Sequence, residues 1–146
     1  MKVPRRFTLG ILMLLITAVA ILFAFAGWRK RNLISEVGKL NQEGMKRVSV
    51  SDDWFWPVPI SDGIVSFDKD EDGRYFADGK LLTTGELRNR YADFSSRLEA
   101  IGVSPVSLGL LVTKEMNGGT IYFSMVFGSI EEFDEAMKEM AEQAAP

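Results

Sequence analysis

Residues 7–28 form a run of 22 residues without a charged side chain, FTLGILMLLITAVAILFAFAGW. As an α-helix this run would be about 33 Å long, and the hydrocarbon core of a bilayer is about 30 Å thick. A buried helix of a soluble protein would carry polar residues on its outer face, and this run offers only two threonines and small glycines. The run therefore predicts a transmembrane helix in contact with the lipid bilayer, preceded by a basic tail at residues 1–6.

Basic residues flank the run at both ends, and a tryptophan stands at its C-terminal boundary. The predicted membrane-flanking set consists of Arg5, Arg6, Trp28, Arg29, Lys30 and Arg31. Ala24-Phe25-Ala26 also forms an A-x-A pattern, so a signal peptide cleaved after Ala26 is the alternative. The run exceeds the roughly 7–15 apolar residues of a signal peptide, and basic residues follow it directly. These features favour a retained anchor.

The formal net charge of −3 conceals two halves of opposite sign. Residues 1–47 hold nine basic and two acidic side chains, whereas residues 48–146 hold eight basic and 18 acidic ones. The acidic half predicts a soluble body that disfavours nucleic-acid binding. Orientation stays open, because Lys39, Lys46 and Arg47 favour a cytoplasmic body, whereas a basic start before an apolar run is typical of a signal anchor. We expect the body to lie outside the cytoplasm.

The 146 residues include no cysteine and no histidine. This excludes disulfides, thiolate chemistry, histidine-dependent zinc sites and histidine-based triads. The predicted span also lacks an ionisable side chain, which would mark a proton or ion pathway. We expect no enzymatic activity, because no nucleophile is paired with a base. A metal-dependent hydrolase that uses Asp68, Asp70 or Asp72 is the alternative.

Residues 29–47 form a basic juxtamembrane segment in which Leu33, Val37 and Leu40 recur at helical spacing. This spacing predicts a helical stalk that extends the membrane helix and ends near Gly44. A coiled-coil contact with a partner is the alternative, but the repeat is too short to indicate one.

The linker at residues 48–61 contains three adjacent aromatic residues, Trp54, Phe55 and Trp56. Two prolines follow them and exclude a regular helix. The cluster is either an exposed docking patch or a segment that folds back onto its own domain. The second interpretation is favoured, because aromatic side chains contribute large apolar areas to cores.

An acidic segment follows the first predicted strand of the body and has the pattern D-x-D-x-D-G. Its carboxylates are Asp68, Asp70 and Asp72. This is the opening half of a calcium-binding loop, and Ca²⁺ is the one cofactor that the sequence suggests. The twelfth position is Gly79 rather than the bidentate glutamate, and the flanking residues read as strands rather than helices. An acidic hairpin turn is therefore the favoured interpretation.

The soluble body at residues 62–143 alternates strand and helix patterns. T-x-x-E and S-x-x-E capping boxes begin apolar stripes at Thr83 and Ser129, and a further strand pair is joined by Asn117-Gly118-Gly119. Strands are predicted at residues 63–67, 74–77, 106–113 and 121–127. The order ββαββα predicts an α+β fold with a four-stranded antiparallel sheet and two helices on one face. A circularly permuted ferredoxin-like plan would satisfy this arrangement.

Residues 64–98 contain I-V-S-F-D-x(4)-G-R-Y-F-A-D-G-K-L-L-T-T-G-E-L, which resembles the extracytoplasmic domain of the ExbD/TolR family of envelope energy-coupling proteins. The resemblance implies a small α+β domain on a single membrane helix. The family's membrane aspartate has no counterpart in this span, and its element order differs after the third strand, so a proton-coupled role is not implied. The flanks R-R-F-T-L and W-R-K-R are similar to those of uncharacterised bacterial envelope proteins, which implies location only.

These features predict a single-pass membrane protein whose small acidic α+β domain is a binding or scaffold module for a protein partner in the cell envelope. The alternative is an ExbD/TolR-like accessory subunit of an envelope energy-coupling or transport complex.

Overall fold

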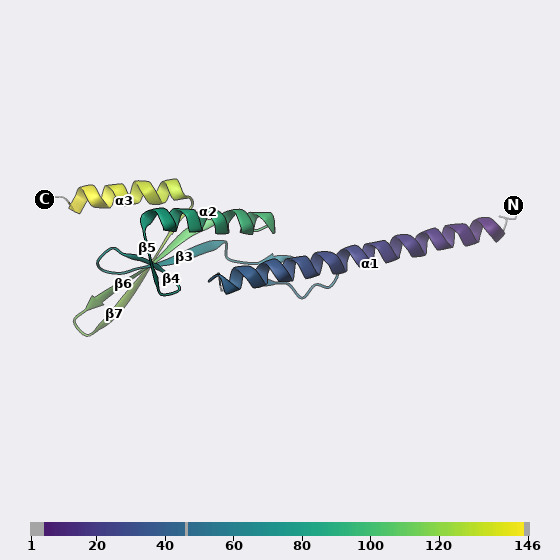
Figure 1. The fold of residues 1–146 in the computed structure, drawn as a ribbon, viewed down its shortest axis with the longest axis horizontal. Helices are drawn as coiled ribbons and strands as arrows, with labels where there is room; N and C mark the ends of the chain where they lie inside the picture. The colour runs from purple at the N-terminus through teal and green to yellow at the C-terminus, as the bar shows by residue number, and fades with distance from the viewer. Residues whose placement is uncertain (1–4, 46, 145–146) are drawn as a thin grey trace.

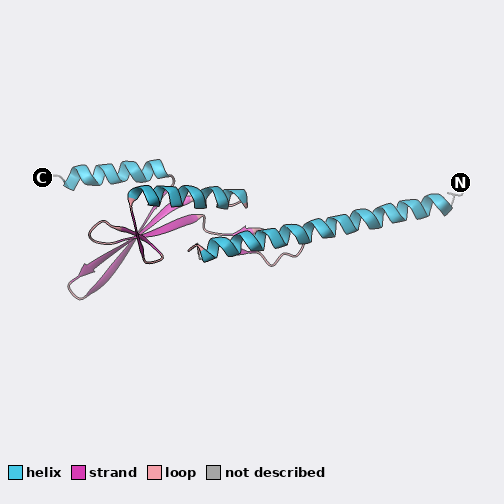
Figure 2. Ribbon diagram, viewed as in Figure 1, coloured by secondary structure: helices cyan, strands magenta, loops and turns pink. Residues whose placement is uncertain are grey.

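The computed structural model describes residues 5–45 and 47–144, and the side chains of residues 8–45 and 47–143. A single helix, α1 (Arg5–Gln42), projects from one end of an α+β domain (Figure 1). The chain then forms a two-stranded sheet, a five-stranded sheet and two further helices (Figure 2). The predicted α+β class with an N-terminal apolar helix is thus confirmed.

The larger sheet has the strand order β5-β4-β3-β6-β7. Its strands are β3 (Ile64–Lys69), β4 (Tyr75–Ala77), β5 (Lys80–Leu82), β6 (Ser107–Met116) and β7 (Gly119–Phe127). The remaining elements are α2 (Thr84–Ala100), α3 (Ile130–Ala144) and the two-stranded hairpin of β1 (Ser49–Val50) and β2 (Pro59–Ile60). β3 and β6 are parallel, and all other neighbouring strands are antiparallel.

The prediction of a four-stranded antiparallel sheet in the order ββαββα differs from this topology in two ways. The turn at Asp78 and Gly79 returns Lys80–Leu82 onto β4 as an additional strand. α2 then carries the chain back along the sheet, so that β6 enters beside β3 in the same direction, with Val65 opposite Leu108. A helical crossover of this kind connects parallel neighbours.

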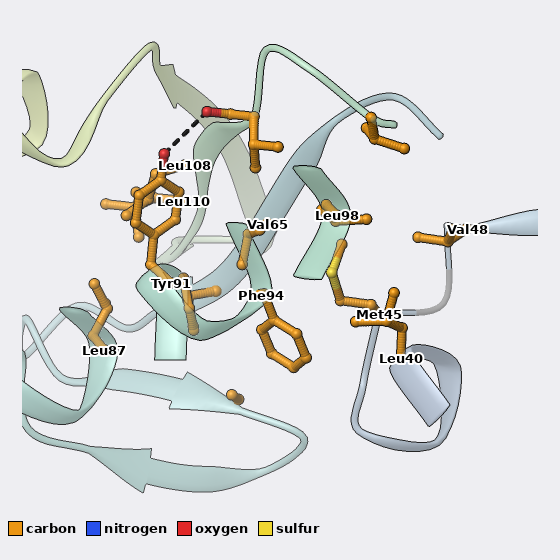
Figure 3. Close-up of a cluster of buried hydrophobic side chains, with 14 of the residues drawn as sticks. Leu40, Met45, Val48, Val65, Leu87, Tyr91, Phe94, Leu98, Leu108 and Leu110 are labelled. Atoms are coloured by element: carbon orange, nitrogen blue, oxygen red, sulfur yellow. Dashed lines mark hydrogen bonds between the residues drawn. The ribbon is translucent and has the colours of Figure 1, made fainter. Parts of the chain in front are cut away.

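α2 and α3 bury their apolar stripes against the same face of the five-stranded sheet, as expected. The buried positions of α2 are Leu87, Tyr91, Phe94 and Leu98, and α3 contributes the fully buried Phe133. They join Val65, Phe67, Leu108 and Leu110 of the central strands in one core (Figure 3). The hydroxyl of Tyr91 donates to the carbonyl of Val106 over 3.0 Å, so the polar end of this buried ring is satisfied.

The predicted capping boxes explain where the two helices begin. The Thr83 hydroxyl accepts from the Glu86 N–H at 3.2 Å, and the Glu86 carboxylate accepts from the Thr83 N–H at 2.7 Å. At α3 the Ser129 hydroxyl accepts from the Glu132 N–H, but the Glu132 carboxylate accepts from Gly128 instead of Ser129. Both arrangements satisfy N–H groups at the helix start.

The C-terminal part of α1 is a component of this core rather than a free stalk. Leu33, Val37 and Leu40 are buried, because the apolar face that they form packs into the same cluster as the sheet and α2. The helix ends where Gly44 takes a φ of 108°, which favours glycine, and where the Met45 N–H donates to the Leu40 carbonyl over 2.9 Å.

Replacing Leu40 with alanine tests whether α1 belongs to the core. Leu40 is 1% exposed, so Leu40→Ala should lower the free energy of unfolding by about 2–5 kcal/mol through the cavity that it leaves. Ile34 on the same helix is 50% exposed, and Ile34→Ala should change that free energy by less than about 0.5 kcal/mol. Pulse proteolysis of the full-length protein in detergent over a urea series measures both values. Equally small losses of unfolding free energy in the two variants would show that α1 is not part of the core.

Candidate functional site

The N-terminal part of α1 presents an apolar surface that stays largely exposed within the described part of the chain. Its side chains from residue 8 to residue 25 are exposed, and the first buried position is Ala26. α1 is long and apolar enough to cross a membrane, and an 18-residue stretch of it has a mean hydropathy of 2.8. Of the predicted flanking residues, Trp28, Arg29, Lys30 and Arg31 lie where this surface ends, and the side chains of Arg5 and Arg6 lie outside the described part.

The hairpin of β1 and β2 returns along α1 toward this apolar surface. We call its connecting segment, residues 51–58, the aromatic loop. The Trp54 ring stacks on the Phe23 ring with centroids 5.4 Å apart and planes inclined by 19°. The Phe55 and Trp54 rings meet edge-on, with their centroids 5.6 Å apart. The Arg29 guanidinium lies 3.9 Å from the centroid of the Trp56 ring.

The favoured prediction, that the aromatic cluster folds back onto its own domain, is wrong, because the cluster contacts α1 and stays exposed. Trp54 and Trp56 remain 62% and 51% exposed, and Phe55 is also exposed. The reason is that the hairpin is anchored to α1 through β1, while the core is already filled by α2 and the sheet. No local pattern indicates that Phe23, 31 residues earlier, is the stacking partner of Trp54.

Hydrogen bonds fix the shape of the aromatic loop. The Asp53 carboxylate accepts from the N–H groups of Phe55 at 2.9 Å and Trp56 at 3.0 Å. The Ser51 hydroxyl accepts from the Val58 N–H at 3.0 Å. Pro57 between them has no N–H to satisfy. The four consecutive residues 55–58 therefore expose no unbonded backbone donor.

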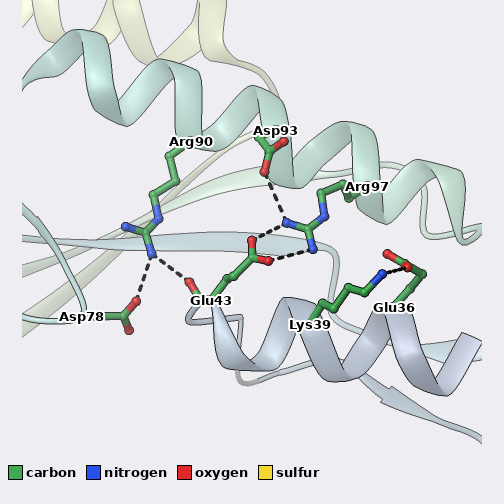
Figure 4. Close-up of polar contacts among 7 residues, drawn as sticks. All are labelled: Glu36, Lys39, Glu43, Asp78, Arg90, Asp93 and Arg97. Carbon is green, nitrogen blue, oxygen red and sulfur yellow. Dashed lines mark hydrogen bonds and ion pairs between the residues drawn. The ribbon is translucent and has the colours of Figure 1, made fainter.

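A cluster of charged side chains ties the end of α1 to α2 (Figure 4). Both carboxylate oxygens of Glu43 contact the Arg97 guanidinium, one of them at 3.2 Å, and Arg97 also contacts Asp93 at 3.4 Å. Arg90 donates to the Glu43 carbonyl at 2.8 Å and to the Asp78 carboxylate at 3.0 Å. The hydrogen bond from Arg97 lowers the pKa of Glu43, and it outweighs the partial burial that alone would raise that pKa.

The calcium-loop candidates lie along the hairpin between β3 and β4. The Asp70 carboxylate accepts from the Arg74 N–H and from its Nε, both at 2.8 Å, and Asp72 contacts the same guanidinium at 2.7 Å. Desolvation alone would raise the pKa of Asp70, but these bonds from Arg74 lower it. Asp68 lies within β3, opposite Phe76. Among the described residues, no three histidine, cysteine, aspartate or glutamate side chains form a group that could hold a metal ion.

A pocket of about 180 Å³ lies where the end of α1 meets β3 and β4. It opens there because β4 pairs with β3 only at Asp68 and Lys69. Two of its charged lining residues, Asp78 and Arg90, are bonded to each other, and Arg90 also donates to the Glu43 carbonyl just after α1.

β7 forms one edge of the five-stranded sheet, and this edge is exposed. β7 pairs with β6 on one side, and no strand in the described ranges pairs with its other side. Its nine residues, GTIYFSMVF, include no charge and no proline, and Tyr122 and Val126 are 64% and 54% exposed on the face that the helices leave open. Edge strands of monomeric proteins usually carry charges, prolines or bulges that prevent further pairing. We call this strand and its free backbone groups the β7 edge.

The ion pair of Glu43 predicts a specific dependence of stability on pH. Because the folded-state pKa of Glu43 lies below its ordinary value of 4.5, its stabilising effect is present above that value and is lost as the pH falls through the folded-state pKa. Glu43→Gln should therefore flatten the change in unfolding free energy between neutral pH and acid, whereas Glu139→Gln, at an exposed position of α3, should preserve it. Urea unfolding of full-length protein at a series of pH values measures this. Identical profiles for the two variants would contradict the assignment.

No family model matches this chain, and no curated protein or solved structure matches it. Function is therefore inferred from the apolar part of α1, the aromatic loop, the charged cluster and the β7 edge themselves.

Proposed function

We propose that this chain is a single-pass membrane-anchored protein whose acidic α+β domain is a binding or scaffold module for a protein partner in the cell envelope. The observation that carries the proposal is the continuity of α1. One helix presents the apolar surface of residues 8–25 and also contributes Leu33, Val37 and Leu40 to the domain core. Leu33 follows Trp28 by five residues, which is about 8 Å along a helix. The domain is therefore held directly at the membrane surface.

The β7 edge is the surface through which the module binds its partner. Its outward N–H and C=O groups can pair with an extended segment, and strand addition of this kind draws its affinity from backbone hydrogen bonds. The exposed apolar side chains of Ile121, Tyr122, Phe123 and Val126 supply contacts on both faces of the added strand. The partner chemistry that fits is an extended, uncharged segment of another envelope protein.

The carboxylates with lowered pKa values have structural partners. The pKa values of Glu43, Asp70 and Glu86 are lowered, and each of these carboxylates is held by an arginine or by a helix cap. Such partners stabilise the charged form of each of the three side chains. The ExbD/TolR-like accessory role stays a prediction, because no comparison bears on it. We also place the acidic domain outside the cytoplasm, with the basic N-terminal tail inside.

Site-specific photocrosslinking tests the β7 edge as the binding surface. The chain lacks cysteine, so Tyr122→Cys provides one attachment point for a maleimide benzophenone probe in native membranes. Leu81→Cys is the matched control, since Leu81 is 60% exposed on β5, the other edge of the same sheet. We expect an adduct of defined mass from Tyr122→Cys and none from Leu81→Cys.

A second substitution in the same strand separates strand addition from chance proximity. Adding Val126→Lys to Tyr122→Cys should reduce the adduct yield about tenfold, since a lysine buried against an added strand costs more than about 1.4 kcal/mol. Adding Leu81→Lys should leave the yield unchanged. No adduct at Tyr122, or equal adducts from both edges, would contradict binding at β7.

A further inference from the structure

We infer that the aromatic loop is a second membrane-contacting element, which places Trp54 and Phe55 in the phospholipid interface beside α1. The inference rests on the proposed membrane anchor and adds a separate lipid-binding site, formed by a segment outside the span. Its occupant is the zone of a phospholipid bilayer where the headgroups meet the acyl chains.

The position of Phe23 along α1 sets the depth of the loop. Phe23 lies five residues before Trp28, within the uncharged run, so it is about 8 Å nearer the bilayer centre. Trp54 stacks on Phe23 at 5.4 Å. When α1 spans a bilayer with Trp28 at its boundary, the Trp54 ring is carried below the headgroups with it.

The exposed aromatic area of the loop fits this location. Trp54, Phe55 and Trp56 are exposed in the isolated chain although they lie beside the anchor. Lipid would cover this apolar surface, and tryptophan is enriched at the boundary between water and hydrocarbon. Their exposure in one contiguous segment distinguishes them from scattered apolar residues on a soluble surface.

Side-chain acceptors satisfy three backbone N–H groups of the loop. A polar group without a hydrogen-bond partner is costly in lipid, so irregular segments are normally excluded from it. Here Asp53 and Ser51 accept from Phe55, Trp56 and Val58, and Pro57 has no donor. These three N–H groups therefore need no new partner when the loop enters the interface.

Cations at the base of the loop suit the phosphate layer. The Arg29 guanidinium lies over the Trp56 ring, and Lys30 follows it in α1. At the depth set by Phe23 and Trp28, both cations lie level with the lipid phosphates, which attract them. The loop and α1 then form two attachments to the bilayer, which fix how the domain is rotated about the helix axis and so where the β7 edge faces.

The three tryptophans of the chain allow a direct test, because each can be made the sole emitter. Full-length protein is reconstituted in phosphatidylcholine vesicles whose acyl chains are brominated close to the headgroup, with unbrominated vesicles as the reference. A variant with Trp28→Phe and Trp56→Phe reports Trp54. A second variant with Trp54→Phe and Trp56→Phe reports Trp28 and hence the anchor.

We expect bromine to quench Trp54 at least as strongly as Trp28, and acrylamide in the water to quench Trp54 weakly. Quenching of Trp28 without quenching of Trp54 would overturn the inference and leave the membrane anchor in place. Absence of quenching at both positions would overturn the membrane anchor itself. The two failures are therefore distinguishable in one set of samples.

Discussion

The packing of Leu33, Val37 and Leu40 into the core is the contact on which the rest of the molecule depends. Each of these side chains gains about 1.5–3 kcal/mol when it is removed from water, so α1 is held by the same force that folds the domain. A helix is stiff, and these residues begin about two turns after the apolar surface of residues 8–25 ends. The position of the domain relative to that apolar surface is consequently determined by the fold.

Two further sets of contacts depend on this geometry. Arg90 and Arg97 of α2 reach Glu43 because α1 and α2 run side by side at the end of the anchor (Figure 4). Trp54 reaches Phe23 because β1 packs on α1 and directs its hairpin back along the helix. Neither set would form on a flexible stalk. The same rigidity gives the β7 edge, at the far end of the domain, a defined place with respect to the apolar part of α1.

Local patterns in the sequence predicted the elements better than their arrangement. The uncharged run, the capping box of Thr83 and the stripe from Leu87 to Leu98 all act within a few residues, and each corresponds to a feature of the structure. The additional strand β5 was missed because three residues after a tight turn carry little periodicity. The parallel pairing of β3 and β6 depends on the path of α2, which no local pattern encodes.

The candidate site was predictable only in part for the same reason. Trp54 to Trp56 attracted notice as an aromatic cluster, but its partner Phe23 belongs to a segment whose composition indicates only hydrophobicity. Glu43 and Arg97 are 54 residues apart, and nothing near either residue predicts their contact. The acidic motif at Asp70 was visible, yet the neighbouring Arg74, which binds its carboxylate, decides the structure of that turn.

The central claim, that α1 and the domain form one rigid unit, is tested most directly by an interspin distance. The substitutions Leu22→Cys, on the apolar part of α1, and Asn89→Cys, on the exposed side of α2, provide two sites for spin labels. The chain has no other cysteine to label. Double electron–electron resonance on the doubly labelled, full-length protein in lipid nanodiscs gives the distribution of distances between these sites. A single narrow distribution is the predicted result. A broad distribution, of the width produced by a flexible linker, would contradict the account.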